Sequence, residues 1–165
     1  MQRIAVRGLG LFGLLERKPS EEIVKQLRLS FINGPTQISV VACKALIDLG
    51  MWHGPQEVDG ALGGDFSSKV QDNKQAFSPV NFSDIDGSLK VQMLDLLYAG
   101  IDKDDWDNSL VSDECESVQA ILGEGFAKIL LQSENYPSLP ASLHPSLLAK
   151  LINLYFSNET KHLQR

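Results

Sequence analysis

Apolar residues recur along the chain every three to four positions, and no stretch of five or more residues alternates between apolar and polar in the way of a half-buried strand. The clearest case is residues 20–33, where Ser20 suits the helix start and Leu27 and Phe31 share one face. Gly34, followed by proline, suits its end. The pattern therefore predicts an all-α protein, with helices over about residues 2–17, 20–33, 36–51, 88–101, 113–132, 145–157 and 158–165.

Residues 52–87 interrupt this pattern. They are rich in Gly, Ser, Asp and Asn and hold too few apolar side chains to offset the entropy lost on ordering. The surrounding charge is also uneven. Residues 52–117 carry four Lys or Arg against fourteen Asp or Glu, for a net charge of −10, whereas residues 1–51 carry +3 and residues 118–165 carry +1. We therefore expect a flexible acidic insertion over 52–87 between two mildly basic helical parts.

A motif with small residues recurs along the predicted helices. It begins at Met1, Ile38, Val118 and Leu163, so that its copies are separated by 37, 80 and 45 residues. A period of roughly 40 residues per helix pair is typical of HEAT and armadillo repeats, and the long gap contains the insertion. The spacing predicts an α-solenoid of antiparallel helix pairs over 1–165. Because both ends fall inside a repeat, we expect this single domain to be a fragment of a longer solenoid.

The predicted inner face of the helix at 145–157 consists of leucine, isoleucine and tyrosine side chains at helical spacing. These residues are Leu147, Leu148, Leu151, Ile152 and Tyr155, and Pro145 suits the first turn before them. Asn158 is a plausible cap for the last predicted helix.

Two sets of polar residues are candidates for binding or regulation. Six basic residues of the first helices could lie along one side and meet phosphates, although a solvated face is the commoner fate of such residues; they are Arg3, Arg7, Arg17, Lys18, Lys25 and Arg28. Ser78 precedes Pro79, and Ser83 precedes Asp84, so both serines are minimal matches to protein kinase sites. A simple turn explains the same short patterns.

Gly8, Gly10 and Gly13 have the G-x-G-x-x-G spacing of a dinucleotide-binding turn. Pro19 ends the following segment too soon for the helix of that fold, and no second strand with a terminal acid follows. We therefore interpret these glycines as small residues at a helix packing contact. A small dinucleotide-binding enzyme remains a remote alternative.

A second near match lies in the acidic linker. Asp105, Asp107, Ser109 and Glu116 occupy positions 1, 3, 5 and 12 of a calcium-binding loop, but Leu110 stands where the sharp turn needs glycine. A solvated acidic loop is the better interpretation.

The remaining candidates for catalysis or metal binding are scattered. His53, His144 and His162 have no serine, cysteine or acid at a spacing that suggests a triad or a metal cluster, and we expect loop or capping roles for them. Cys43 lies in an apolar pattern and Cys115 in an acidic one, so neither a disulfide framework nor a zinc site is indicated. The sequence thus predicts no enzyme, no cofactor and no small-molecule substrate.

Two aromatic residues stand out beside helix ends, Trp52 after one helix and Trp106 among aspartates. We expect the tryptophan in the acidic loop, Trp106, to anchor back on the solenoid, with contact to a partner as the alternative. No apolar run approaches the roughly 20 residues that a membrane-spanning helix needs, so no membrane partner is expected.

The repeats also show a more specific resemblance. Residues 11–18 (LFGLLERK), 42–50 (ACKALIDLG), 123–130 (GEGFAKIL) and 148–156 (LAKLINLYF) are similar to the C-terminal HEAT region of condensin subunit 3, the G-type non-SMC subunit, in its plant form. The resemblance covers nearly the whole chain but only part of that subunit.

The resemblance implies a non-enzymatic scaffold that binds the H-type kleisin, through it the SMC subunits, and duplex DNA or chromatin. It implies a role in mitotic chromosome condensation, in the nucleus and on chromosomes, with a cytoplasmic pool possible. ATP hydrolysis would belong to other subunits. The alternative is a HEAT or armadillo scaffold of another class, such as a transport receptor, a phosphatase scaffold or an adaptor.

Overall fold

The computed structural model describes residues 1–63, 77–83, 89–103, 106, 117–133 and 141–163, with the side chains of the last helix described up to residue 156. The regular structure of this part is helical throughout, which confirms the predicted all-α class. Its elements are α1 (Gln2–Leu15), α2 (Glu21–Asn33), α3 (Thr36–His53), α4 (Pro55–Gly60), α6 (Met93–Asp102), α7 (Val118–Gln132), the 3-10 turn η2 (Ala141–Leu143) and α8 (His144–Leu163).

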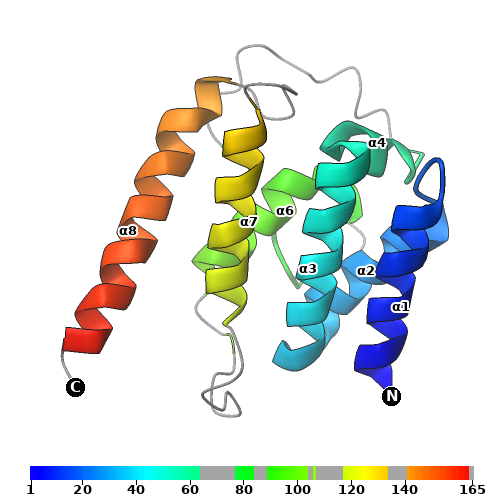
Figure 1. Cartoon of the computed structure of the whole chain (residues 1–165), viewed down its shortest axis with the longest axis horizontal. Helices are drawn as coiled ribbons and strands as arrows, with labels where there is room; N and C mark the ends of the chain where they lie inside the picture. The colour runs from blue at the N-terminus through cyan, green and yellow to red at the C-terminus, as the bar shows by residue number, and fades with distance from the viewer. Residues whose placement is uncertain (64–76, 84–88, 104–105, 107–116, 134–140, 164–165) are drawn as a thin grey trace.

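The helices form two layers (Figure 1). Helices α1, α3 and α7 lie side by side in one layer, and α2 and α6 lie behind them. Helix α2 lies behind α3 and runs in the opposite direction, and α6 crosses behind α7 at an oblique angle, so two helix pairs stack through the contact between α3 and α7. Helix α8 then packs against α7 in the opposite direction. This arrangement agrees with an α-solenoid.

The centre of the fold is α3, whose buried side chains face α1, α2 and α7. Ala42, Leu46 and Leu49 have no exposed surface. Gly10 of α1 lies so close to Ala45 that a Cβ atom built on the glycine would stand 2.7 Å from the Ala45 Cβ. Small residues therefore bring these two helices together, as the interpretation of the glycines predicted.

The turn between α2 and α3 depends on a glycine for a steric reason. Gly34 has φ −70° and ψ 155°, so it does not use the left-handed conformation common at helix ends. A Cβ atom there would lie 2.3 Å from the backbone oxygen of Ser30. Space in the last turn of α2, and not backbone conformation, thus favours glycine at this position.

Two helices begin later than predicted. Helix α6 begins at Met93, not near residue 88, because the carbonyls of Leu89 and Val91 accept hydrogen bonds from a distant arginine. Helix α7 begins at Val118, where the Ser117 hydroxyl accepts a hydrogen bond from the Ala120 N–H at 3.1 Å.

The predicted break at Asn158 is wrong, since α8 continues through this position to Leu163. Its only helix-breaking residue is Pro145, which lies in the first turn, where a missing N–H costs nothing. One helix of 20 residues therefore replaces the two that were predicted.

The prediction of a flexible insertion over 52–87 is wrong for its first part. Helix α3 continues to His53, and α4 follows at once, with Val58 and Asp59 buried. Residues 77–83 also pack against the helices, as described below. Residues 64–76 and 84–88 lie outside the described part of the chain.

The buried face of α8 also differs from the prediction. Leu147 is fully buried, but Leu148, Ile152 and Tyr155 are 51%, 46% and 61% exposed. The side of α8 that meets α7 instead uses Leu154, whose Cδ2 would lie 2.8 Å from a Cβ atom built on Gly123. Because α7 is the main helix against which α8 packs, part of the predicted core face stays in contact with solvent.

Candidate partner-binding face

The outer side of the layer formed by α1, α3 and α7 carries three pairs of charged residues. Each helix contributes one pair four positions apart, which places both members on the same side of that helix. The pairs are Arg3 and Arg7 on α1, Lys44 and Asp48 on α3, and Glu124 and Lys128 on α7. We call this surface, with the two grooves between its helices, the α1–α3–α7 face.

The larger groove, of about 370 Å³, lies between α1 and α3. Its charged lining comes from Arg3, Arg7, Lys44 and Asp48. The rest of the lining is apolar or glycine, namely Gly10, Leu11, Leu14, Val40, Val41 and Ala45. Three cations and one carboxylate around an apolar floor suit a peptide segment that carries both apolar and acidic side chains.

The smaller groove, of about 230 Å³, lies between α3 and α7 and shares Lys44 and Asp48 with the first. Here Lys128 Nζ lies 2.6 Å from Glu124 Oε1, and both side chains are more than half exposed. The hydrogen bond and charge of Lys128 lower the pKa of Glu124. Because exposed ion pairs contribute little to stability, this pair is not needed to hold α7 in place.

Asp48 stands between the two grooves. Partial burial raises the pKa of its carboxyl group, while the charges of Lys128 and Lys44 act in the opposite direction. The carboxylate is therefore incompletely solvated and would gain from a cationic group brought by a partner. The charge pairs on α3 and α7 were missed in the sequence, although their four-residue spacing is a recognisable signal.

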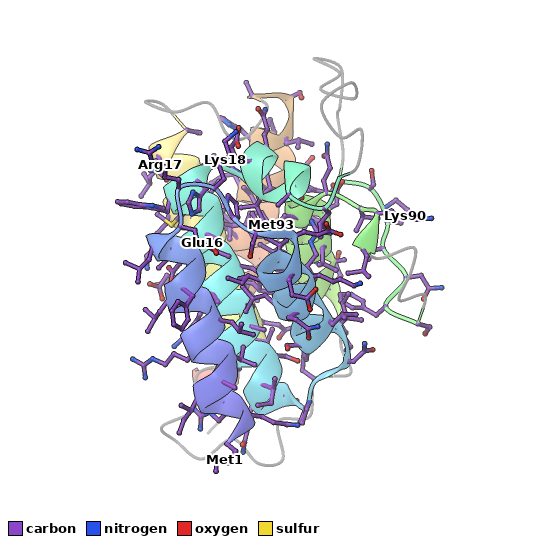
Figure 2. All side chains as sticks on the ribbon, turned by 90° about the vertical axis from the view of Figure 1, so that its right-hand side faces the viewer. Met1, Glu16, Arg17, Lys18, Lys90 and Met93 are labelled. Atoms are coloured by element: carbon purple, nitrogen blue, oxygen red, sulfur yellow. The ribbon has the colours of Figure 1, made fainter. Side chains whose placement is uncertain are left out.

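The structure distributes the predicted basic residues over several surfaces. Arg3 and Arg7 belong to the α1–α3–α7 face. Arg17 and Lys18 are exposed at the other end of α1, far from Met1 (Figure 2). Lys25 is exposed on α2, in the second layer.

Arg28 is the exception, because it has no exposed surface at all. Its Nη2 donates to Asp59 Oδ1 at 2.6 Å, and its Nη1 donates to the carbonyls of Val91 at 2.7 Å and Leu89 at 3.3 Å. Burial lowers the pKa of Arg28, and the charge of Asp59 opposes that shift. The prediction that Arg28 faces DNA or a partner is therefore wrong: this side chain holds α2, α4 and the segment before α6 together.

A comparison with known protein families identifies the chain. The model of the family described as nuclear condensing complex subunits, C-terminal domain, matches residues 1–165. The chain belongs to this condensin family. No curated protein and no solved structure matches it.

Family membership confirms the resemblance seen in the repeats and makes the chain part of a condensin subunit. The family comprises regulatory subunits without enzymatic activity, which associate with other condensin components. Its members are nuclear and chromosome-associated. The condensin assignment replaces the alternatives of a transport receptor, a phosphatase scaffold and an adaptor.

The glycine motif of this condensin domain is not a dinucleotide turn. Gly8, Gly10 and Gly13 all lie inside the continuous helix α1, and not at the junction of a strand and a helix. Backbone amides inside a helix donate to carbonyls of the preceding turn. His53 Nε2 lies 2.8 Å from the carbonyl oxygen of Gly13 and so ties the end of α3 to the end of α1. This contact confirms the capping role expected for His53.

The remaining candidate residues of the condensin domain are those of the calcium-binding pattern and the two cysteines. The calcium-loop positions Asp105, Asp107, Ser109 and Glu116 lie outside the described residues, as does Cys115. Within the described part, no group of three His, Cys, Asp or Glu side chains could hold a metal ion, and no helix is long and apolar enough to span a membrane. Burial raises the pKa of the Cys43 thiol to about 12, so this side chain behaves as a small apolar residue.

The two tryptophans behave differently. Trp106 is buried, donates from Nε1 to the Gly100 carbonyl at 2.9 Å and lies against Phe31, which confirms the expected anchor. Trp52, by contrast, is 71% exposed at the end of α3.

Proposed function

We propose that this condensin domain is a non-catalytic scaffold whose α1–α3–α7 face binds a segment of the H-type kleisin. Through the kleisin it would be connected to the SMC subunits, and with it would contact DNA in mitotic chromosome condensation. The observation that carries the proposal is the larger groove, where Arg3, Arg7 and Lys44 surround an apolar floor. Membership in a family of condensin subunits supplies the class of partner.

The groove suits a peptide better than a nucleic acid backbone. Its floor is apolar, and phosphates gain nothing from apolar contacts. An acidic and apolar kleisin segment would satisfy the cations at the rim and cover the floor at the same time.

For DNA, we propose a different set of residues, the exposed Arg17 and Lys18 at the turn after α1. These side chains lie at the end of α1 opposite Met1 (Figure 2), and neither lines the larger groove, so that DNA and kleisin need not compete for one groove. Contacts to phosphates release counterions and therefore weaken steeply as salt rises.

Kleisin binding is tested by fluorescence anisotropy with labelled fragments of the H-type kleisin. The double variant Arg3→Glu/Arg7→Glu should weaken binding at least about 10-fold, which corresponds to about 1.4 kcal/mol. Lys25→Glu is the matched control, because it reverses an exposed charge on the other layer. Equal affinities of the double variant and the wild-type chain would exclude this groove as the kleisin site.

DNA binding is tested by titrating a short duplex at several salt concentrations. Each phosphate contact contributes about 0.9 to the slope of log K against log salt. Arg17→Ala/Lys18→Ala should therefore lower that slope by about 2, while kleisin affinity stays unchanged. An unchanged slope would place the DNA contact elsewhere.

A further inference from the structure

Residues 77–83 contact the three helices α2, α6 and α7; we call this segment the strap. Phe77, at one end, stacks on Tyr98 of α6 with ring centroids 4.0 Å apart and planes 6° apart. It also meets Phe126 of α7 edge to face at 6.0 Å. Phe82, at the other end, meets Phe31 of α2 edge to face at 6.1 Å.

Lys103 adds a second contact at the Phe82 end. Its Nζ lies 5.0 Å from the centre of the Phe82 ring and 4.2 Å from that of Trp106. The strap is thus held by aromatic contacts at both of its ends.

The strap also makes a hydrogen bond to α6. The backbone N–H of Ser78 donates to Asp95 Oδ1 at 3.0 Å. Asp95 lies in the first turn of α6 and is 3% exposed, whereas Ser78 and Pro79 are exposed. The buried Asp95 carboxylate therefore binds the backbone N–H of Ser78, although Ser78 itself is exposed to solvent.

The same serine has a distinctive place in the sequence. Of the seven prolines, only Pro79 follows a serine or threonine. A proline-directed protein kinase would thus find a single site of its preferred kind in the chain.

We propose that Ser78 is a phosphorylation site, and that its phosphorylation releases the whole strap from α2, α6 and α7. The kinase transfers the γ-phosphoryl group of ATP to Ser78 Oγ: the new O–P bond forms as the bond to the β,γ-bridging oxygen breaks, ADP leaves, and the hydroxyl proton passes to the catalytic base of the kinase.

The reason for release is electrostatic. A phosphoserine carries a charge of about −1.5 to −2 at neutral pH, and here it would stand on the residue whose N–H bonds the Asp95 carboxylate. Asp95 has little contact with water that could screen the repulsion. Breaking this contact removes the tether beside Phe77, and the departing strap uncovers the ring face of Tyr98 beside Phe126.

The inference is independent of the kleisin proposal, because no strap residue lines either groove. It is tested on the 165-residue chain with a proline-directed kinase and ATP, with phosphorylation followed by mass spectrometry. Ser78→Ala should abolish incorporation, and Ser83→Ala should leave it unchanged. Incorporation that survives Ser78→Ala, or no incorporation into the folded wild-type chain, overturns the proposal.

Release of the strap is measured by hydrogen exchange of the Ser78 amide. Phosphorylation should accelerate this exchange at least about 10-fold, because the bond to Asp95 and the Phe77 contact open together. An unchanged exchange rate in the fully phosphorylated chain overturns the proposal.

Asp95→Asn is the decisive variant, since an amide oxygen can still accept from the Ser78 N–H but carries no charge. Each protein is compared with its own unphosphorylated form, so any loss of stability in the variant cancels. Phosphorylation of Asp95→Asn should accelerate exchange much less than in the wild-type chain. An equal acceleration in both overturns the electrostatic mechanism.

A second readout reports on the other end of the strap. In a Trp52→Phe background, Trp106 is the remaining tryptophan, buried beside the Lys103 that also covers Phe82. Phosphorylation should increase its quenching by acrylamide. Unchanged quenching would contradict release of the whole strap.

Discussion

Arg28 of α2 and Asp59 of α4 form a buried ion pair, with Nη2 2.6 Å from Oδ1 and side chains that are 0% and 6% exposed. The same Asp59 oxygen accepts the N–H of Met93 at 2.8 Å and so holds the first residue of α6. The pair thus connects an early helix, a short helix and a late one through groups far apart in the sequence.

Removing one partner of this pair should be strongly destabilising. Asp59→Ala leaves a buried guanidinium without its counter-ion, and we expect a loss of about 3–5 kcal/mol in the free energy of unfolding. Arg28→Met should also destabilise, but the double variant should cost less than the sum of the two single changes, because neither charge is then left alone. Urea unfolding of the four proteins measures this coupling.

The control is Glu124→Ala in the exposed pair with Lys128, for which we expect no resolvable change in the urea midpoint. Additive effects of Asp59→Ala and Arg28→Met would contradict the pairing.

Two glycines of α1 should respond in opposite ways to alanine. Gly8→Ala meets no atom within 4 Å and should stabilise the protein by about 0.5–1 kcal/mol through the better helix propensity of alanine. Gly10→Ala would place its Cβ 2.7 Å from that of Ala45, so α1 must move away from α3. We expect that change to destabilise by about 1–3 kcal/mol. Thermal unfolding compares the two variants, and equal shifts would show that α1 does not pack through Gly10.

The Cys43 thiol should be unreactive in the native state. Only thiolates attack reagents such as iodoacetamide, and burial raises the pKa of Cys43 to about 12. In a Cys115→Ser background, alkylation at pH 8 should be slow in buffer and fast in urea. Rapid alkylation of the folded protein would contradict burial.

The same shift predicts a pH dependence of stability. The folded pKa is raised from an unfolded value of about 8.5, so the native state retains a proton that the unfolded chain loses. This contribution is present below about pH 8.5 and is lost as the pH rises from there through about 12. Cys43→Ala should lack this part of the decline, which a series of urea midpoints between pH 7 and pH 10 would reveal.

The two tryptophans should differ in fluorescence. Trp52 is 71% exposed and Trp106 8% exposed, so iodide should quench Trp52 strongly and Trp106 weakly. The variants Trp52→Phe and Trp106→Phe separate the two signals. Similar quenching of both would contradict the burial of Trp106.

Much of the fold follows from local patterns. Helices α2 and α3 begin and end within about two residues of the predicted positions, because caps, the Gly34-Pro35 turn and apolar spacing all act over a few neighbouring residues. The family resemblance likewise depends on short sequence segments, and the family match confirms it. Of the candidate site, Arg3 and Arg7 are exposed, and their role in binding stays a prediction.

The sequence by itself determined the all-α class, the principal helices and the condensin family, since these depend on neighbouring residues. Only the tertiary structure decided that Arg28 is internal, although its spacing of four from Val24 and three from Phe31 already places it on the buried side of α2. A charge is normally too costly to bury, and here the cost is offset by Asp59, 31 positions away, and by carbonyls still further along the chain. The same long-range contacts hold α4 in place and set the start of α6 at Met93. The sequence could not predict them, because no local pattern of residues 52–92 specifies which distant group will complete these hydrogen bonds.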